Sequence, residues 1–294
     1  MIRAKCLQTS FAWLAAGSLC AAGLRAEAAE PFFFIQLTDP QFGMFTTNRD
    51  FSQETANFEF AVATINRLHP AFVVVTGDLV NKVGAAAQIR ECKRIEAEVD
   101  PAIPVYNVAG NHDVGNVPTP ASVAAYTNQF GPDHYVFRRD DFVGIVLDSN
   151  LIQAPQHVRD LAAAQASWLK SALQSARAGG ARHIVIFQHH PWFLKTPDEP
   201  DQYFNLPRER RTAYLALFRQ FGVAAVFCGH YHRNDSVRAG EVEVVTTGAL
   251  GMPLGGSQSG LQVVIVRAGG ITHHFYDLGE IPNRINVGPV SEIR

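Results

Sequence analysis

Five short stretches of this chain place metal-binding side-chain types in a fixed order. Their donors are Asp39, Asp78, Asn111, His189, His230 and His232. Carboxylate and amide oxygens mixed with imidazole nitrogens, with no cysteine among them, suit Mn, Fe, Zn or Mg. A single Gly-Asp is usually a turn, and a single His-x-His is more often surface or core. Five such elements together predict a metal cradle.

Each of these stretches directly follows a short apolar run. The runs are residues 32–37, 72–75, 105–108, 183–187 and 224–227. Nearly continuous apolar character over four to six residues is typical of a strand buried on both faces. Ligands of open α/β sheets bind at the carboxyl ends of the strands. We therefore expect five strands to deliver these donors to one edge.

The rest of the chain alternates strand-like and helix-like segments. Further strands are expected at 143–147, 242–246 and 261–266, and helices at 54–68, 85–98, 121–130, 162–178 and 208–221. Alternation of this kind predicts an α/β architecture. Strands dominate toward the C-terminus, which favours a mixed sheet.

The spacing within the stretches favours two metals over one. Glycine precedes Asp78, Asn111 and His230, and lets the backbone turn sharply at a strand end. In an extended segment His230 and His232 point to different sides, so they need not bind the same ion. The two oxygens of Asp78 can bridge cations roughly 3.5–4 Å apart, as in two-metal phosphatases.

The first 28 residues are predicted to be a cleaved signal peptide. Arg3 and Lys5 precede an uncharged apolar run at 11–24, and Ala26-x-Ala28 fits a cleavage site. The run is shorter than the roughly 20 residues of a membrane span, which argues against an anchor. Cys20 follows Leu19 where a lipoprotein has a small residue, so lipidation is disfavoured. The mature protein is expected to be secreted or periplasmic.

Residues 29–294 are expected to form one domain. A net charge of −2 without a basic stripe argues against a nucleic-acid partner. The mature chain has no second long apolar run, so we expect no membrane span in it. Cys92 and Cys228 lie in a helix-like and a strand-like segment, and we expect both to be unpaired.

The ordered series resembles the calcineurin-like metallophosphoesterase superfamily over nearly the whole mature chain. Its motifs here are Asp39, Gly77-Asp78, Gly110-Asn111-His112-Asp113, His189-His190-Pro191 and Gly229-His230-Tyr231-His232. Residues 38–43, 187–189, 203–206 and 229–234 are similar to one branch, the calcineurin-like phosphoesterase domain-containing protein 1 group. The resemblance implies mixed sheets in a β-sandwich flanked by helices, with the metal site at strand carboxyl ends.

The resemblance also implies a role for each donor. The first metal would be held by Asp39, Asp78 and His232. The second would be held by Asp78, Asn111, His189 and His230, with Asp78 bridging. Much of the superfamily has a histidine where this chain has Gln41. A neutral amide oxygen is a poorer donor than imidazole for a transition metal, so the first site is expected to bind more weakly or to take a hard ion.

The implied reaction is phosphomonoester hydrolysis by a metal-bridging water. Asn111 would stabilise charge on the phosphoryl oxygens, and His112 would protonate the leaving group. Asp113 would orient the His112 imidazole. The alternative for His112 is a structural loop histidine.

Substrate contacts are expected from Asn111, His190, Tyr203 and Arg233. Residues 198–206 follow the fourth motif and form either a lid or an ordinary packed loop, and Arg233 either contacts phosphate or fixes its loop. The resembled branch is associated with phosphoserine and phosphothreonine protein phosphatases, so the substrate is expected to be a phosphoprotein or a small phosphate ester. A phosphodiesterase and a non-catalytic metal-binding protein are the alternatives.

Overall fold

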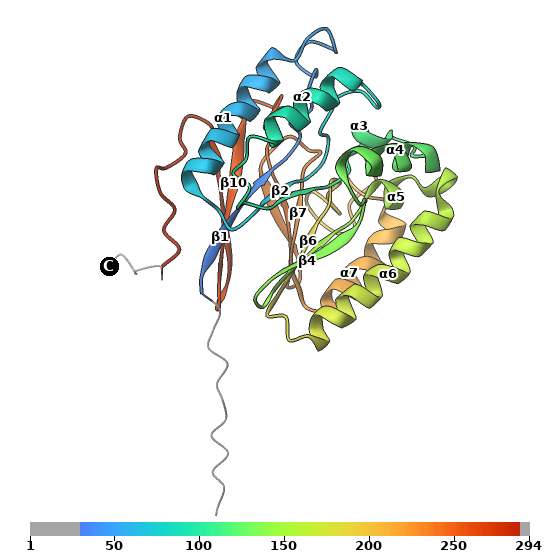
Figure 1. Cartoon of the computed structure of the whole chain (residues 1–294). Coiled ribbons are helices and arrows are strands. Elements are labelled where there is room, and N and C mark those ends of the chain that lie inside the picture. The colour runs from blue at the N-terminus through green and yellow to red at the C-terminus, as the bar shows by residue number, and fades with distance from the viewer. Residues whose placement is uncertain (1–29, 289–294) are drawn as a thin grey trace, which may run out of the picture.

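Two mixed β-sheets form the centre of the protein (Figure 1). The structure is a computed structural model that describes residues 30–288. The predicted signal peptide at residues 1–28 lies outside the described residues. All eight predicted strands are present, with bounds shifted by at most one residue at either end.

The first sheet carries three of the donor-bearing strands. Its order is β11 (Gly270–Asp277), β10 (Gly260–Arg267), β1 (Phe32–Leu37), β2 (Val73–Val75) and β3 (Val105–Asn107). Strands β1, β2 and β3 are parallel, so their carboxyl ends meet at one edge. Strand β10 runs antiparallel to β1, and β11 runs antiparallel to β10.

The second sheet carries the other two donor-bearing strands. Its order is β4 (Tyr135–Arg139), β5 (Phe142–Val146), β6 (His183–Phe187), β7 (Val223–Cys228), β9 (Val242–Thr246) and β8 (Asp235–Ala239). The four central strands are parallel, and the two edge strands are antiparallel to their neighbours.

Phenylalanine side chains join the inner faces of the two sheets. The ring of Phe34 on β1 stacks on Phe72 at 4.7 Å between centroids. It also meets Phe187 and Phe227 of the second sheet edge-on, at 5.6 and 5.8 Å. Aromatic pairs at such distances combine large burial with a preferred orientation. This dry layer holds the carboxyl ends of β1, β2, β6 and β7 at a fixed separation.

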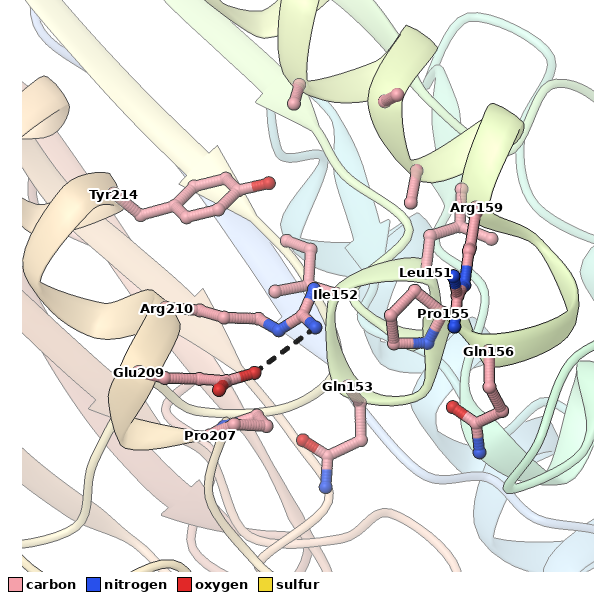
Figure 2. Close-up of a pocket in the computed structure, with 13 residues that line it drawn as sticks. Leu151, Ile152, Gln153, Pro155, Gln156, Arg159, Pro207, Glu209, Arg210 and Tyr214 are labelled. Atoms are coloured by element: carbon pink, nitrogen blue, oxygen red, sulfur yellow. Dashed lines mark hydrogen bonds and ion pairs between the residues drawn. The ribbon is translucent and has the colours of Figure 1, made fainter.

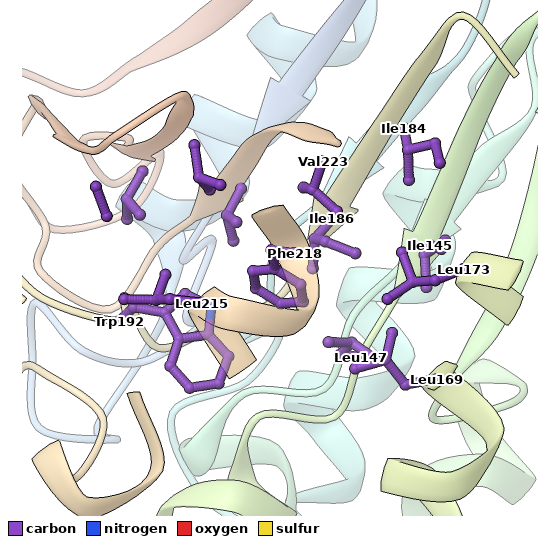
Figure 3. Close-up of a cluster of buried hydrophobic side chains, with 14 of the residues drawn as sticks. Ile145, Leu147, Leu169, Leu173, Ile184, Ile186, Trp192, Leu215, Phe218 and Val223 are labelled. Carbon is purple, nitrogen blue, oxygen red and sulfur yellow. The ribbon is translucent and has the colours of Figure 1, made fainter. Parts of the chain in front are cut away.

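Helices cover the two outer faces (Figure 1). Residues of α1 (Ser52–Leu68) and α2 (Ala86–Glu96) share a core with the first sheet. On the other side, α6 (Arg159–Ala178) and α7 (Arg208–Gln220) pack on the second sheet, with Leu169, Leu173, Leu215 and Phe218 among the buried contacts (Figure 3). The remaining helices are α3 (Asn111–Val114), α4 (Pro120–Phe130), α5 (Asn150–Gln153) and the 3₁₀ helix η1 (Pro155–His157). The predicted α/β class, with mixed sheets flanked by helices, is confirmed.

The three strands that the sequence did not predict all lie at sheet edges. Strands β4, β8 and β11 each have one neighbour. An edge strand is half exposed, so its sequence carries polar and charged residues, as Tyr135–Arg139 and Asp235–Ala239 do. A search for continuously apolar runs does not detect such strands.

The described cysteines are both buried and free, as expected. Cys92 lies in α2 and Cys228 ends β7. Within residues 30–288, none of the helices combines the length and the apolar character needed to cross a membrane.

Candidate metal centre

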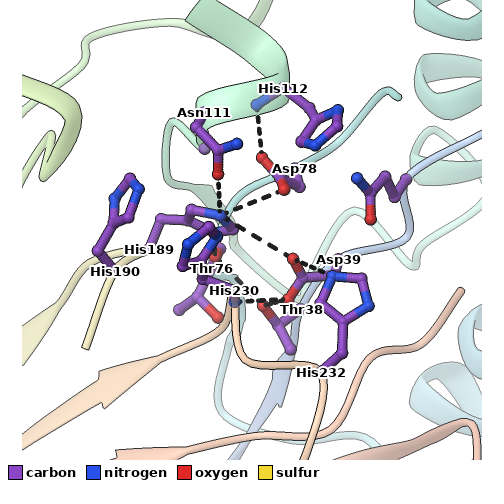
Figure 4. Close-up of polar contacts among 12 residues, drawn as sticks. Thr38, Asp39, Thr76, Asp78, Asn111, His112, His189, His190, His230 and His232 are labelled. Atoms are coloured by element: carbon purple, nitrogen blue, oxygen red, sulfur yellow. Dashed lines mark hydrogen bonds and ion pairs between the residues drawn. The ribbon is translucent and has the colours of Figure 1, made fainter. Parts of the chain in front are cut away.

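The strand ends bring all six predicted donors together (Figure 4). Asp39 and Asp78 follow β1 and β2, Asn111 begins α3 after β3, and His189 follows β6. His230 and His232 follow β7. Each of these residues is at most 3% exposed. Donors from five separate segments therefore share one buried site between the two sheets.

The backbone is strained at most of these positions. Non-glycine residues with positive φ include Asp39 at 50°, Asp78 at 51°, His230 at 65° and His232 at 54°. Gln41 has the smallest such value, 40°. A left-handed conformation at a non-glycine residue costs on the order of 1–3 kcal/mol, and such strain gathers at functional sites. The fold holds these side chains in orientations that the local chain would avoid.

Two glycines permit the close approach of the strand ends. A Cβ on Gly110 would overlap the backbone and carboxylate of Asp78, and a Cβ on Gly229 would overlap Thr38. Neither obstacle is a flexible side-chain end that could swing away. The glycines that precede Asn111 and His230 are therefore required by packing between segments.

Asp78, His189 and His230 form one group of donors. One ligand atom from each lies within 4.8 Å of the others. His189 Nε2 is 3.2 Å from Asp78 Oδ2 and 3.0 Å from Asn111 Oδ1. The Asn111 amide nitrogen donates to Asn116, which directs its oxygen toward His189. Four donors thus converge on one point.

Asp39, Asp78 and His232 form a second group that shares Asp78 with the first. His232 Nε2 is 3.1 Å from Asp39 Oδ1. The other oxygen of Asp39 accepts hydrogen bonds from the Thr38 hydroxyl at 2.6 Å and the His230 amide at 3.1 Å. Oδ1 is left without a hydrogen-bond partner and points into the site.

Gln41 follows Asp39 by two residues, its backbone amide donates to Asp78 O at 2.9 Å, and its side-chain oxygen is unused. Its side-chain amide nitrogen donates to Asn81 Oδ1 at 3.3 Å, while its Oε1 is buried with no hydrogen-bond partner. A buried carbonyl oxygen without a partner costs about 1–3 kcal/mol. Gln41 can therefore offer an oxygen to a cation at the position where the superfamily has histidine.

Backbone carbonyls determine which nitrogen of each histidine is free. His189 Nδ1 contacts Thr76 O at 2.8 Å, and His232 Nδ1 contacts Met252 O at 2.6 Å. His230 Nε2 contacts Tyr203 O at 3.0 Å. A carbonyl only accepts, so each of these nitrogens carries a proton and the opposite nitrogen is available to a metal.

The converging lone pairs require positive charge between them. Burial lowers the pKa of His189, but the carboxylates of Asp78 and Asp39 outweigh burial and raise this pKa to about 10. Burial alone would raise the pKa of Asp78, yet the neighbouring histidines hold it below its ordinary value. Unpartnered buried oxygens and imidazole nitrogens in this arrangement fit divalent cations, with Asp78 common to both positions.

The structure does not bear out the predicted pairing of Asp113 with His112. The two oxygens of Asp113 accept from the backbone amides of Val80 and Gly110, at 3.2 and 2.8 Å. His112 Nδ1 instead contacts the backbone carbonyl of Asn81 at 2.7 Å. Asp113 is satisfied by amides of its own turn and of the Asp78 loop, so it ties those two segments together. Burial and the nearby Asp78 raise the pKa of Asp113 to about 8.

Asn81 is the functional residue that sequence inspection missed. Its carbonyl orients His112, its side-chain oxygen fixes the Gln41 amide, and it lies three residues after Asp78. A polar residue at that spacing was the only signal available. Its use of a backbone atom has no sequence signature.

His190 lies beside the donors without joining either group. The Ser149 hydroxyl accepts from the His190 backbone amide at 3.0 Å and lies 2.9 Å from the ring Nδ1. The ring centroids of His190 and His230 are 4.3 Å apart. Burial, together with the charges of His230 and His189, holds the pKa of His190 well below the ordinary histidine value. A neutral ring that accepts the Ser149 proton at Nδ1 presents an N–H at Nε2.

Tyr203 and Arg233 lie at the opening of the centre. Tyr203 is 55% exposed, and its hydroxyl is 3.4 Å from the Asn111 amide nitrogen. The Arg233 guanidinium is exposed and lies 5.2 Å from the centre of the Tyr231 ring. The segment 198–206 is thus tied to the site through Tyr203, while Asn234 fixes the next loop by accepting from Gly248 N at 2.7 Å.

Comparison with known proteins identifies the family. The family model described as calcineurin-like phosphoesterase matches residues 34–234. The chain belongs to the calcineurin-like phosphoesterase family. The serine/threonine-protein phosphatase CPPED1 of Danio rerio is 36% identical over 273 residues, which cover 88% of each chain. The Homo sapiens CPPED1 is 37% identical over 270 residues, which cover 86% of each chain. The predicted superfamily and branch are both confirmed.

Solved structures of low sequence identity share the fold. A dimetal phosphatase from Danio rerio superposes with a TM-score of 0.59 at 16% identity, over 84% of this chain and 99% of that one. A purple acid phosphatase from yellow lupin seeds gives 0.61 at 10% identity, over 85% and 52%. At these identities the likeness shows the fold alone.

Family membership and the donor geometry agree. This calcineurin-like phosphoesterase is a metal-dependent enzyme that acts on phosphate esters, and its two donor groups sharing Asp78 are consistent with a binuclear metal site.

Substitution of Gln41 is expected to affect the two metal positions unequally. Gln41→Ala removes the unused oxygen beside Asp39, so the Kd for the first metal should rise about tenfold or more, with the second little changed. Mn²⁺ titration followed by calorimetry measures both. The control Gln174→Ala changes an exposed glutamine of α6. Two equally tight sites that survive Gln41→Ala would contradict a ligand role for Gln41.

Metal affinity is expected to rise with pH. In the metal-free protein the raised pKa of His189 keeps its ring protonated below about pH 10, so a bound metal must displace that proton. The affinity of the second site should increase about tenfold per pH unit between about pH 6 and 9. The same shift stabilises the metal-free fold fully below pH 6.5, and this contribution is lost as pH rises through about 10. Competition with a fluorescent chelator gives the affinities, and values independent of pH would refute the displacement.

Proposed function

We propose that this protein hydrolyses phosphomonoesters, with phosphoserine and phosphothreonine side chains among its substrates. The observation that carries the proposal is the placement of His112 directly beside the shared ligand Asp78. The His112 backbone amide donates to Asp78 Oδ1 at 2.8 Å. An acid at that position can reach the leaving oxygen of an ester whose phosphoryl group lies at the metal centre.

Two divalent cations bound there would lower the pKa of a water that serves as the nucleophile and would offset charge on the phosphoryl oxygens. The chain's own part is to hold a rigid, nearly dry site around the ester. The donors are buried and their backbone is fixed by contacts between strand ends, so little reorganisation is needed when the substrate binds. The metal identity we propose is Mn, Fe, Zn or Mg, as the mixed oxygen and nitrogen donors favour.

His112 is proposed as the general acid. Its Nδ1 donates to the Asn81 carbonyl, which leaves Nε2 to carry the proton given to the leaving alkoxide. The contact with this carbonyl fixes the plane of the ring. This places Asn81 in the orienting role that was expected of Asp113.

His190, Asn111, Tyr203 and Arg233 are proposed to bind the substrate. The neutral His190 ring offers an N–H donor near His230, which suits a phosphoryl oxygen. The amide nitrogen of Asn111 and the hydroxyl of Tyr203 are donors at the opening. Arg233 is exposed and lies against Tyr231, where it can meet a charged group that approaches from solvent.

The substrate class draws its support from the relatives. The curated proteins that share 36–38% identity are named serine/threonine-protein phosphatases. The matches cover 85–88% of the present chain. A phosphodiesterase activity is the rival outcome, since the same pair of metals can cleave both ester types.

A small panel of esters tests the proposal. Purified protein with added Mn²⁺ should hydrolyse phosphoserine peptide and nitrophenyl phosphate, with kcat/KM at least about tenfold above that for bis-nitrophenyl phosphate. A chelator should abolish the activity, and Mn²⁺ should restore it. A preference for the bis-ester would replace the proposal with a phosphodiesterase. No hydrolysis of any phosphate ester would refute the proposal.

Removal of His112 should affect poor leaving groups most. His112→Ala is expected to lower kcat for phosphoserine peptide by about 10²–10⁴-fold, because a serine alkoxide needs a proton as it departs. Nitrophenolate leaves without protonation, so kcat for nitrophenyl phosphate should fall less than about tenfold. His274→Ala, at an exposed position on β11, is the matched control. Equal losses on both esters would rule out the acid role.

A further inference from the structure

A groove of about 670 Å³ opens between the first turns of α6 and α7 (Figure 2). Its floor is formed by α5 and η1. We name it the α6–α7 groove, and its characteristic lining residues are Gln153, Pro155, Arg159, Pro207, Arg210 and Tyr214. None of them belongs to the metal centre.

Both walls of the groove are joined to the metal centre. On the α5 side, Gln153 N donates to Ser149 O at 2.8 Å, and the Ser149 hydroxyl contacts His190. On the α7 side, Pro207 follows the segment whose Tyr203 carbonyl orients His230. Leu206 N also donates to Pro191 O at 2.9 Å. Each wall of the groove thus lies four residues along the chain from a residue, Ser149 or Tyr203, that contacts a histidine of the centre.

Two arginines give the groove its charge. Arg159 and Arg210 lie on opposite walls (Figure 2). Within residues 30–288 Arg159 makes no ion pair, and Arg210 has only a 3.3 Å contact with Glu209, whose side chain is 74% exposed. So exposed a pair contributes little, and both guanidiniums remain available to an acidic ligand. The N-termini of α6 and α7 add partial positive charge, which is partly offset by Asp160 and Glu209 in their first turns, Glu209 being a lining residue of the groove.

The remaining lining suits an extended chain. Small side chains line the α6 wall of the groove, namely Ala162, Ala163 and Ala166, and Pro207 also lines the groove. The Gln153 side-chain oxygen is buried without a partner, and amide side chains can pair with a peptide backbone. A small phosphate ester would occupy only the metal centre, whose donors do not line the groove, whereas a longer peptide could contact both.

We propose that the α6–α7 groove binds the acidic stretch of a phosphoprotein that flanks the phosphorylated residue, with Arg159 and Arg210 pairing to its carboxylates. The phosphoryl group would lie at the metal centre at the same time. This inference rests on the proposed phosphomonoesterase function and specifies its substrate as an acidic phosphopeptide.

The kinetic test compares two phosphoserine peptides that differ only in flanking glutamates or glutamines, with nitrophenyl phosphate as a third substrate. The double variant Arg159→Gln, Arg210→Gln should lower kcat/KM for the glutamate peptide about tenfold, mainly through KM, and each single variant about threefold. Rates with nitrophenyl phosphate and with the glutamine peptide should change less than about twofold. Arg90→Gln, at an exposed arginine of α2, is the matched control and should change none of them.

A binding test separates the groove from the chemistry. A fluorescent peptide with the same glutamates and an uncleavable phosphonate in place of phosphoserine is titrated with the Mn²⁺-loaded protein. Its Kd should rise about tenfold in the double variant and stay constant in Arg90→Gln. If the Kd depends on the two arginines but the protein hydrolyses no ester, the groove is supported as a peptide-binding site and the proposed function is refuted.

Three results would overturn the groove. One is an unchanged ratio of kcat/KM between the two peptides in the double variant. Another is an equal loss on nitrophenyl phosphate, which would mean that the substitutions disturb the fold. A third is an equal Kd of the wild-type protein and the double variant for the phosphonate peptide, while the wild-type protein hydrolyses nitrophenyl phosphate. In that case the proposed function would remain.

Discussion

The structure depends on the convergence of buried lone pairs around Asp78. Its carboxylate faces the free nitrogen of His189, while Asp39 faces that of His232, all inside a nearly dry site. These atoms repel one another unless a cation lies between them. In the metal-free protein a proton on His189 supplies that charge, as the pKa of about 10 indicates. The mixed oxygen and nitrogen donors suit a divalent cation.

The two sheets hold the buried donors around Asp78 in place. Strand ends approach so closely that Gly110 and Gly229 admit no side chain, and ligand residues take left-handed backbone conformations. Strain of this size persists only when the surroundings over-determine it. The phenylalanine layer around Phe34 and Phe187 contributes to that rigidity, because it fixes one sheet against the other and Phe187 lies two residues before His189.

The centre is asymmetric in its donors. One half has Asn111, His189 and His230 beside the shared aspartate, each with its orientation fixed by a further hydrogen bond. The other half has Asp39, His232 and the amide of Gln41. Within residues 30–288 the Gln41 side chain makes one hydrogen bond, of 3.3 Å, to Asn81. Asn81 also orients His112. A single residue thus contacts both the proposed ligand Gln41 and the proposed acid.

The sequence alone was sufficient for eight of the eleven strands that the structure describes and for the α/β class, and it named six side chains that the structure brings together (Figure 4). An apolar run followed at once by Asp, Asn or His is a local pattern, and parallel strands bring their carboxyl ends together whatever lies between them. Edge strands such as β8 were not predicted, because a partly exposed strand carries polar residues and lacks a continuous apolar run. The resemblance to a known family assigned the ligand groups, and the geometry places the same residues in two groups.

Only the tertiary structure decided how the site is oriented. The partners of His112, His189, His230 and His232 are backbone carbonyls of residues distant in the chain, and a carbonyl is present at every position of any sequence. The expected pairing of His112 with Asp113 failed for this reason, since Asp113 is used by amides that no pattern reveals. The α6–α7 groove likewise lies between two helices whose first residues are 49 positions apart in the chain. Its two arginines line the same groove only because both helices pack on the same sheet.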